Sequence, residues 1–284
     1  MGRQAQHHYI PASYLSGFTN GGEKTSHFIV KPKSSSLSFV KNPIGICKSR
    51  DYYTIEGADD GLIVEKFYAY EIEPLINKAL KFILEKQKMP TEKNRDNLYL
   101  LLATLYIRHP KARRCLSTAY TDIARFVNED IIEGVKVTNI DAFSYGKNDV
   151  ITSELELLQN LMSHFSNKYY RLYVSRSSDH FITSDSPCYL SHPDMAKCSY
   201  FGINTERTEF CVPINKFIAL VGSNEPMTEG VFDANEKFVA LLNTKIANSS
   251  DKVFISSNRE VKFVDPSFNV YKHTLETKGS NLNI

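Results

Sequence analysis

The pattern of hydrophobic and polar positions divides the chain into three zones, of which the first, residues 1–60, predicts short extended segments. Three stretches of apolar or alternating residues are interpreted as strands, at residues 28–31, 37–40 and 51–55. Glycine-rich stretches at 20–22 and 57–61 are typical of turns. Short strands with such turns predict an antiparallel hairpin or meander.

The second zone, residues 62–167, is predicted to be helical, because its apolar residues recur every three or four positions. Pro90 closes the first helix and Pro110 ends or bends the second, since proline lacks the backbone N–H that a helix interior needs. A third helix is predicted over residues 111–132. A fourth is predicted to begin with Ser153 as its N-cap.

The third zone, residues 168–273, returns to strand-like segments. We expect strands at 169–175, 181–183, 209–214, 217–221 and 252–255, with one helix at 229–247. The pattern therefore predicts an α+β protein, in which strands from both chain ends form a mixed, largely antiparallel sheet with the helices gathered on one side. No composition break divides the chain, so residues 1–273 are predicted to form a single domain with a frayed tail at 274–284.

Composition narrows the class of protein more than its function. The 34 Lys and Arg residues nearly balance 32 Asp and Glu residues, a formal charge of +2 that neither requires nor excludes a nucleic-acid partner. The first eight residues lack the apolar core of a signal peptide, and no apolar run reaches the roughly 20 residues that span a bilayer. Five cysteines without a CxxC pair are typical of reduced thiols. We therefore expect a soluble, cytoplasmic protein without a membrane anchor.

Three segments carry residues suited to chemistry, and the first contains His7 and His8. In a strand, adjacent side chains point to opposite faces, so one imidazole would face a pocket while the other packs or meets solvent. Either ring is a candidate general base or metal ligand. The competing interpretation is that both are polar residues near a chain end, which neighbouring aromatic and aliphatic residues dock onto the core.

The second segment is Arg108-His109-Pro110, at the end of the second predicted helix. Arg108 follows the flank of that helix beside its apolar stripe, so its guanidinium would need a carboxylate, a carbonyl or a bound anion. Phosphate recognition is one use of such a group. A structural salt bridge is the commoner use.

The third segment, residues 181–187, reads Phe-Ile-Thr-Ser-Asp-Ser-Pro. A short apolar strand delivers Ser184 and Asp185 to its end, where side chains can converge on a cleft. Asp185 is there a candidate metal ligand or proton acceptor. Asp and Ser before a proline also form local turns, which provides a purely structural interpretation.

These three segments, in this order and around a helical middle, resemble a bacterial family known as domain of unknown function 4238. The resemblance is carried by the His-His-Tyr-x-Pro, Arg-x-Pro and Phe-x-Thr-Ser-Asp-x-Pro elements and spans roughly residues 6 to 255. The family has no assigned activity that transfers here. What the resemblance implies is that the histidines, the arginine and the Ser-Asp pair form a shared site, with Glu73 matching the family's acidic helix approximately.

Our leading hypothesis from the sequence is a nuclease, acting on RNA or another nucleic acid, with a toxin or anti-phage role. Asp185, assisted by Glu73, would hold Mg²⁺ or Mn²⁺ or orient the nucleophile; His7 or His8 would transfer a proton; Arg108 would stabilise the scissile phosphate. No phosphate-binding loop, dinucleotide fingerprint, HExxH or GxSxG motif supports another chemistry. The alternatives are a non-catalytic binding or sensor module in which these residues are structural, and the binding of a small anionic ligand at Arg108.

Overall fold

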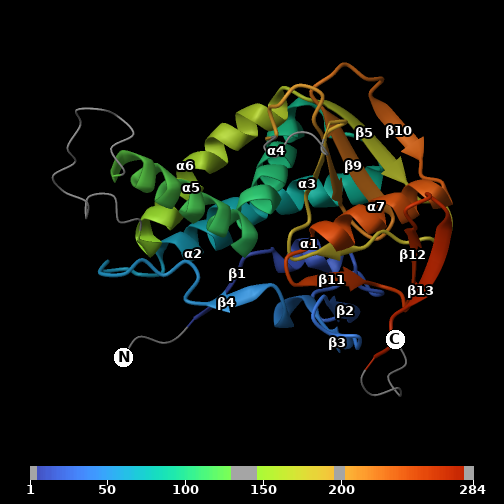
Figure 1. The fold of residues 1–284 in the computed structure, drawn as a ribbon, viewed down its shortest axis with the longest axis horizontal. Helices are drawn as coiled ribbons and strands as arrows, with labels where there is room; N and C mark the ends of the chain where they lie inside the picture. The colour runs from blue at the N-terminus through green and yellow to red at the C-terminus, as the bar shows by residue number, and fades with distance from the viewer. Residues whose placement is uncertain (1–4, 129–145, 195–201, 278–284) are drawn as a thin grey trace.

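The computed structural model describes residues 5–128, 146–194 and 202–277. In this part of the chain, a central group of helices separates one long helical arm from the β-strands (Figure 1). The α+β class and the mostly antiparallel pairing are confirmed. The strands are distributed over several sheets.

The largest sheet has five strands in the order β10-β5-β9-β8-β7. These strands are β5 (Tyr169–Val174), β7 (Tyr189–Ser191), β8 (Glu209–Pro213), β9 (Ile218–Ser223) and β10 (Gly230–Asp233). Only the β5–β10 pair in this sheet is parallel. β9 lies in the middle and is buried along its whole length, in keeping with its apolar sequence.

A second sheet, in the order β3-β2-β11-β6, joins distant parts of the chain. Its strands are β2 (Phe28–Pro32), β3 (Phe39–Lys41), β6 (Thr183–Ser184) and β11 (Val253–Ser256), all paired antiparallel. Strands from the two ends of the chain therefore pair as predicted, with Val30 opposite Ile255. β6 places the third sequence segment beside this C-terminal strand.

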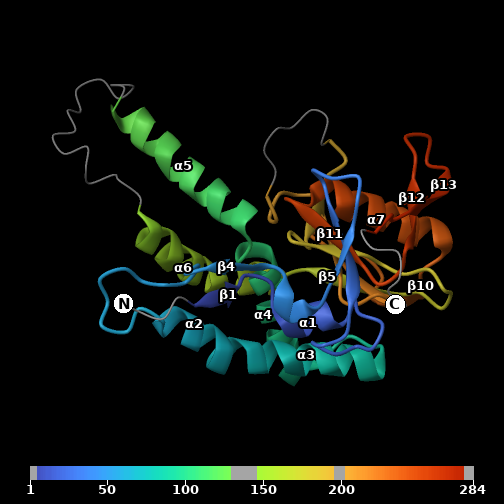
Figure 2. The ribbon, with the colours of Figure 1, turned by 90° about the horizontal axis from the view of Figure 1, so that it is seen from below.

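The helical region consists of α2 (Ile63–Phe67), a π-helical turn η2 (Tyr68–Ile72), α3 (Glu73–Lys86), α4 (Glu92–Ile107), α5 (Pro110–Asn128) and α6 (Lys147–Ser166). α4 packs between α3 and α6, while α5 projects away from the strands beside α6 (Figure 2). Within the described ranges, no helix is long and apolar enough to cross a membrane.

The remaining elements are short, apart from one helix. β1 (Gln6–His8) pairs with β4 (Lys48–Arg50). The short helix α1 (Ala12–Ser16) contacts the 3-10 turn η1 (Pro43–Gly45). α7 (Glu236–Ser249) packs on the ribbon formed by β12 (Glu260–Val264) and β13 (Val270–Thr274). Asn235 caps α7, because its side-chain oxygen accepts the backbone N–H of Phe238.

Several local predictions were wrong. Residues 51–55 form a turn rather than a strand, and β4 precedes them. α6 begins six residues before Ser153, and the predicted helix at 229–247 begins instead at Glu236, after strand β10. Leu275 is 1 % exposed, so the predicted tail is still packed there. Residues 129–132 of the third predicted helix, and 278–284 of the tail, lie outside the described residues.

One glycine in the largest sheet has a packing requirement that can be tested. A Cβ atom at Gly222 in β9 would lie 2.0 Å from Cε1 of Phe210, whose ring is 1 % exposed. Gly222→Ala should therefore lower the free energy of unfolding by about 1–3 kcal/mol through overpacking. Gly202→Ala is the control, since no atom lies within 4 Å of its Cβ position. Equal urea midpoints for the two variants would contradict this prediction.

Candidate functional site

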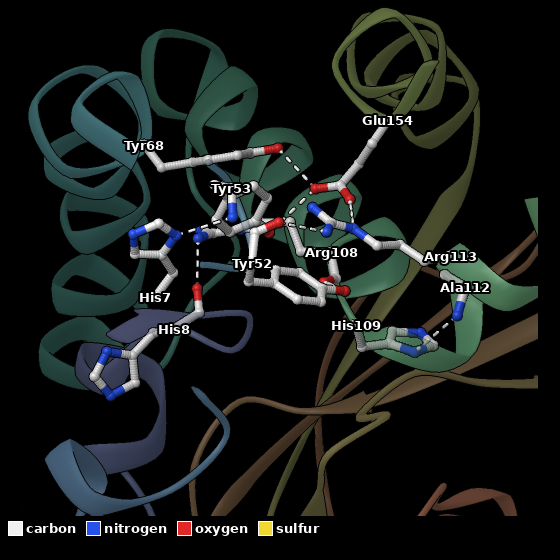
Figure 3. Close-up of polar contacts among 10 residues, drawn as sticks. All are labelled: His7, His8, Tyr52, Tyr53, Tyr68, Arg108, His109, Ala112, Arg113 and Glu154. Atoms are coloured by element: carbon white, nitrogen blue, oxygen red, sulfur yellow. Dashed lines mark hydrogen bonds and ion pairs between the residues drawn. The ribbon is translucent and has the colours of Figure 1, made fainter. Parts of the chain in front are cut away.

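His7 and His8 lie on β1 and, as the strand alternation predicts, their rings point in different directions (Figure 3). His7 is 1 % exposed, and its Nδ1 accepts the backbone N–H of Tyr53 at 2.9 Å. Burial lowers the pKa of His7, so the ring is neutral at pH 7 with its proton on Nε2. In this state His7 offers a hydrogen-bond donor and no free base.

His8 contributes mainly through its backbone. Its carbonyl oxygen accepts a 2.7 Å hydrogen bond from Nη2 of Arg108. Burial and the nearby positive charge of Lys48 lower the pKa of the His8 imidazole, which keeps the ring neutral at pH 7. Its ring is half-buried and faces away from Arg108, so the histidine pair does not converge on one atom (Figure 3).

Arg108 is the largest buried polar side chain of the candidate site and is 1 % exposed. Its guanidinium carbon lies 3.7 Å from the ring centroid of Tyr68 and 5.1 Å from that of Tyr53. Nε donates to the Tyr53 hydroxyl at 2.9 Å, whereas Nη1 is buried without a partner. Among the described residues, no carboxylate lies within salt-bridge distance of Arg108, so the common structural use of such an arginine is not found here.

The Tyr53 hydroxyl connects Arg108 to a buried carboxylate, that of Glu154, which the sequence did not single out. Glu154 on α6 is 0 % exposed, and its Oε1 accepts the hydroxyls of Tyr53 and Tyr68, each at 3.1 Å. Its Oε2 accepts Nε of Arg113 at 2.7 Å. We call these residues, with Arg108, the Glu154 network; Figure 3 shows it drawn together from α4, α5, α6 and the turn after β4.

Beside this network, several polar atoms have no partner in the described part of the chain. They belong to Glu65, Asn77, Thr104, Arg108 and Arg113. Thr104 lies one turn before Arg108 on α4, and Asn77 lies one turn after Glu73 on α3, which packs against α4. Buried polar groups are normally paired, so a concentration of unpaired ones indicates a site for a ligand or for water.

Two acidic residues, Glu65 and Glu73, lie in the electrostatic environment of Arg108. Burial raises the pKa of Glu65, and the negative charge of Glu73 adds to this, whereas Arg108 opposes it. Glu65 is half-buried on α2 and Glu73 is half-buried at the start of α3. A carboxyl group with a raised pKa beside a guanidinium is suited to proton donation. The sequence pointed to Glu73 but not to Glu65.

Ser184 and Asp185 both accept hydrogen bonds from backbone N–H groups. The Asp185 carboxylate is 2 % exposed and accepts the backbone N–H groups of Asp251, Lys252 and Val253 at 2.9, 2.7 and 3.2 Å. Burial raises the pKa of Asp185, although those three donors oppose the shift. The Ser184 hydroxyl oxygen accepts the N–H of Ser186 at 3.1 Å. The Asp185 contacts hold the strand end against β11, whereas only the Ser184 contact is the local kind that the turn interpretation predicts.

The three segments are neighbours without sharing a reacting centre. The first and second meet at the bond between Arg108 and the His8 carbonyl. The second and third meet where His109 Nε2 lies 3.5 Å from the Ser186 hydroxyl. Arg108 and His109 point in opposite directions at the end of α4 (Figure 3). Among the described residues, no three His, Cys, Asp or Glu side chains are grouped to hold a metal ion.

The fold and these segments define an α+β protein with a buried arginine–tyrosine–glutamate network. The model of the family described as protein of unknown function (DUF4238) matches residues 6–260, so the chain belongs to this family. No curated protein and no solved structure matches the chain significantly. The resemblance inferred from the sequence is thereby confirmed.

Proposed function

We propose that the chain recognises a phosphate-bearing ligand through Arg108. The observation that supports this proposal is a permanently charged, fully buried guanidinium whose Nη1 is unsatisfied and which contacts no carboxylate in the described part of the chain. Leaving a buried charge uncompensated is unfavourable. An anion within reach of Nη1 would supply the missing hydrogen bond and the missing charge together.

The charge balance around Arg108 supports the same ligand class. Two guanidinium groups, those of Arg108 and Arg113, are stacked on tyrosine rings, but the fully buried carboxylate between them is that of Glu154 alone. The unpaired Nη2 of Arg113 and Nε2 of His7 are further donors for an anion.

RNA cleavage is the second candidate, in an acid–base form. Glu65 would donate the proton to the leaving oxygen and Arg108 would stabilise charge on the phosphate. His7 has no free base in its neutral form, and the His8 ring faces away from Arg108, so neither histidine is assigned the proton transfer here. Dependence on Mg²⁺ or Mn²⁺, with Asp185 and Glu73 as the ligands, stays a prediction.

Phosphate titration tests the proposal. Inorganic phosphate at about 100 times its dissociation constant should stabilise the wild type by about 2.7 kcal/mol, read as a rise in melting temperature. Arg108→Lys should lose most of this rise, because lysine lacks the planar fork. Arg114→Gln is the matched control: that arginine follows Arg108 by six positions but is exposed, and it should respond like the wild type.

Thr104→Val tests phosphate binding with a substitution that should not destabilise the fold. The Thr104 hydroxyl is fully buried and unpaired, so removing it should leave the unliganded melting temperature unchanged or higher while weakening phosphate binding. If millimolar phosphate does not raise the melting temperature of the wild type, the proposal is ruled out. Incubation of the wild type and Glu65→Gln with RNA, with and without Mn²⁺, separates the two candidates: cleavage that Glu65→Gln abolishes would establish the acid–base nuclease.

A further inference from the structure

A cavity lies at the end of α4, on the side of His109. It encloses about 700 Å³ between α5, α6, β7 and residues 202–205. Its walls are mostly apolar and include Tyr106, Leu116, Leu161, Leu190 and Ile203. Both its size and its lining are typical of a site for a small organic ligand.

Two buried polar side chains of this cavity come from two of the sequence segments. His109 is 6 % exposed and Ser186 is 3 % exposed, and both line the cavity. Nδ1 of His109 accepts the backbone N–H of Ala112 at 3.2 Å (Figure 3). Burial, the largest cause, and the positive charge of Lys111 lower the pKa of His109 to about 4. At pH 7 the ring is therefore neutral and carries its proton on Nε2.

This protonation state determines what the cavity offers a ligand. Nε2–H has the Ser186 oxygen as its partner at 3.5 Å, which is long for a hydrogen bond. His109 therefore cannot deprotonate Ser186, and the two residues are not a nucleophile–base pair. Instead, the buried His109 ring lines a mostly apolar cavity, and the exposed side chain of Lys111 lies on its wall.

We propose that this cavity binds a small monocarboxylate with an apolar body, separately from the phosphate site at Arg108. The carboxylate would accept the N–H of His109 and lie near Lys111, while the apolar body would fill the space lined by α5 and α6. Because His109 follows Arg108 directly, both sites depend on the same turn at the end of α4.

Decanoate and decanol are suitable probes, since they share the apolar body and differ in charge. Calorimetric titration should show that the wild type binds decanoate at least tenfold more tightly than decanol. His109→Phe and Lys111→Gln should each remove most of that preference. Lys111 is exposed, so its variant keeps the test informative if His109→Phe does not fold.

Ala112→Phe tests the position of the apolar body. Ala112 lines the cavity, and a phenyl ring there should weaken binding of both probes at least tenfold, whereas Ala119→Phe, at an exposed position of the same helix, should not. Absence of decanoate binding to the wild type, or binding that Ala112→Phe leaves unchanged, would overturn the proposal. Thr104→Val should leave decanoate affinity unchanged, so failure here is distinguishable from failure of the phosphate site.

Discussion

Replacing Glu154 with glutamine should lower the free energy of unfolding by about 3–5 kcal/mol, the range expected when one partner of a buried ion pair is removed. Glu154 is fully buried and accepts the Tyr53 and Tyr68 hydroxyls and Nε of Arg113. Glutamine keeps the size of the side chain, but its NH₂ group would face a donor, and Arg113 would lose its ion-pair partner.

The measurement is urea unfolding followed by circular dichroism, with Glu156→Gln as the matched control. Glu156 lies on the same helix two residues further on and is exposed, so its variant should stay within about 0.5 kcal/mol of the wild type. A loss of less than about 1 kcal/mol for Glu154→Gln would show that α6 is held by its apolar stripe and not by the network.

Asp185→Ala should have a comparable effect, about 3–5 kcal/mol, for a different reason. The substitution leaves the backbone N–H groups of Asp251, Lys252 and Val253 without their acceptor in a buried place. Each unpaired buried donor costs about 1–3 kcal/mol, and some of these donors would find water. Asp185→Asn should lose less, because the amide oxygen still accepts part of this set.

Thermal and urea unfolding of both Asp185 variants check this prediction, with Asp233→Ala as the control. The Asp233 side chain is 78 % exposed, so its loss should change the melting temperature little. An unchanged melting curve for Asp185→Ala, accompanied by loss of phosphate binding or RNA cleavage, would return Asp185 to the functional site.

Asp185 also shows why the sequence did not decide between a functional role and a local turn for its segment. The local sequence correctly indicated a strand end followed by a tight turn. Its partners, however, are 66 to 68 positions further along the chain. Local residue pattern contains no information on which backbone groups will lie within 3 Å of a carboxylate after folding.

The same limit explains the residues that the sequence did not reveal. Glu154 lies 101 positions from Tyr53 and 86 from Tyr68. On its own helix it looks like one of several acidic residues, and only the packing of α6 on α4 buries it. The signal that could have found it is its spacing from Leu158 and Leu161, which places it on the apolar face.

The sequence by itself determined the α+β class, the helices α3 and α4, and the family of the chain. These depend on short-range physics: the 3.6-residue period of buried positions and the effect of Pro90 and Pro110 on backbone hydrogen bonding. The tertiary structure alone decided which polar groups are buried together. It left Arg108 with an unpaired donor, satisfied Asp185 with backbone N–H groups and turned His109 toward a separate cavity. Burial and pairing depend on contacts between residues far apart in the chain, which no local pattern specifies.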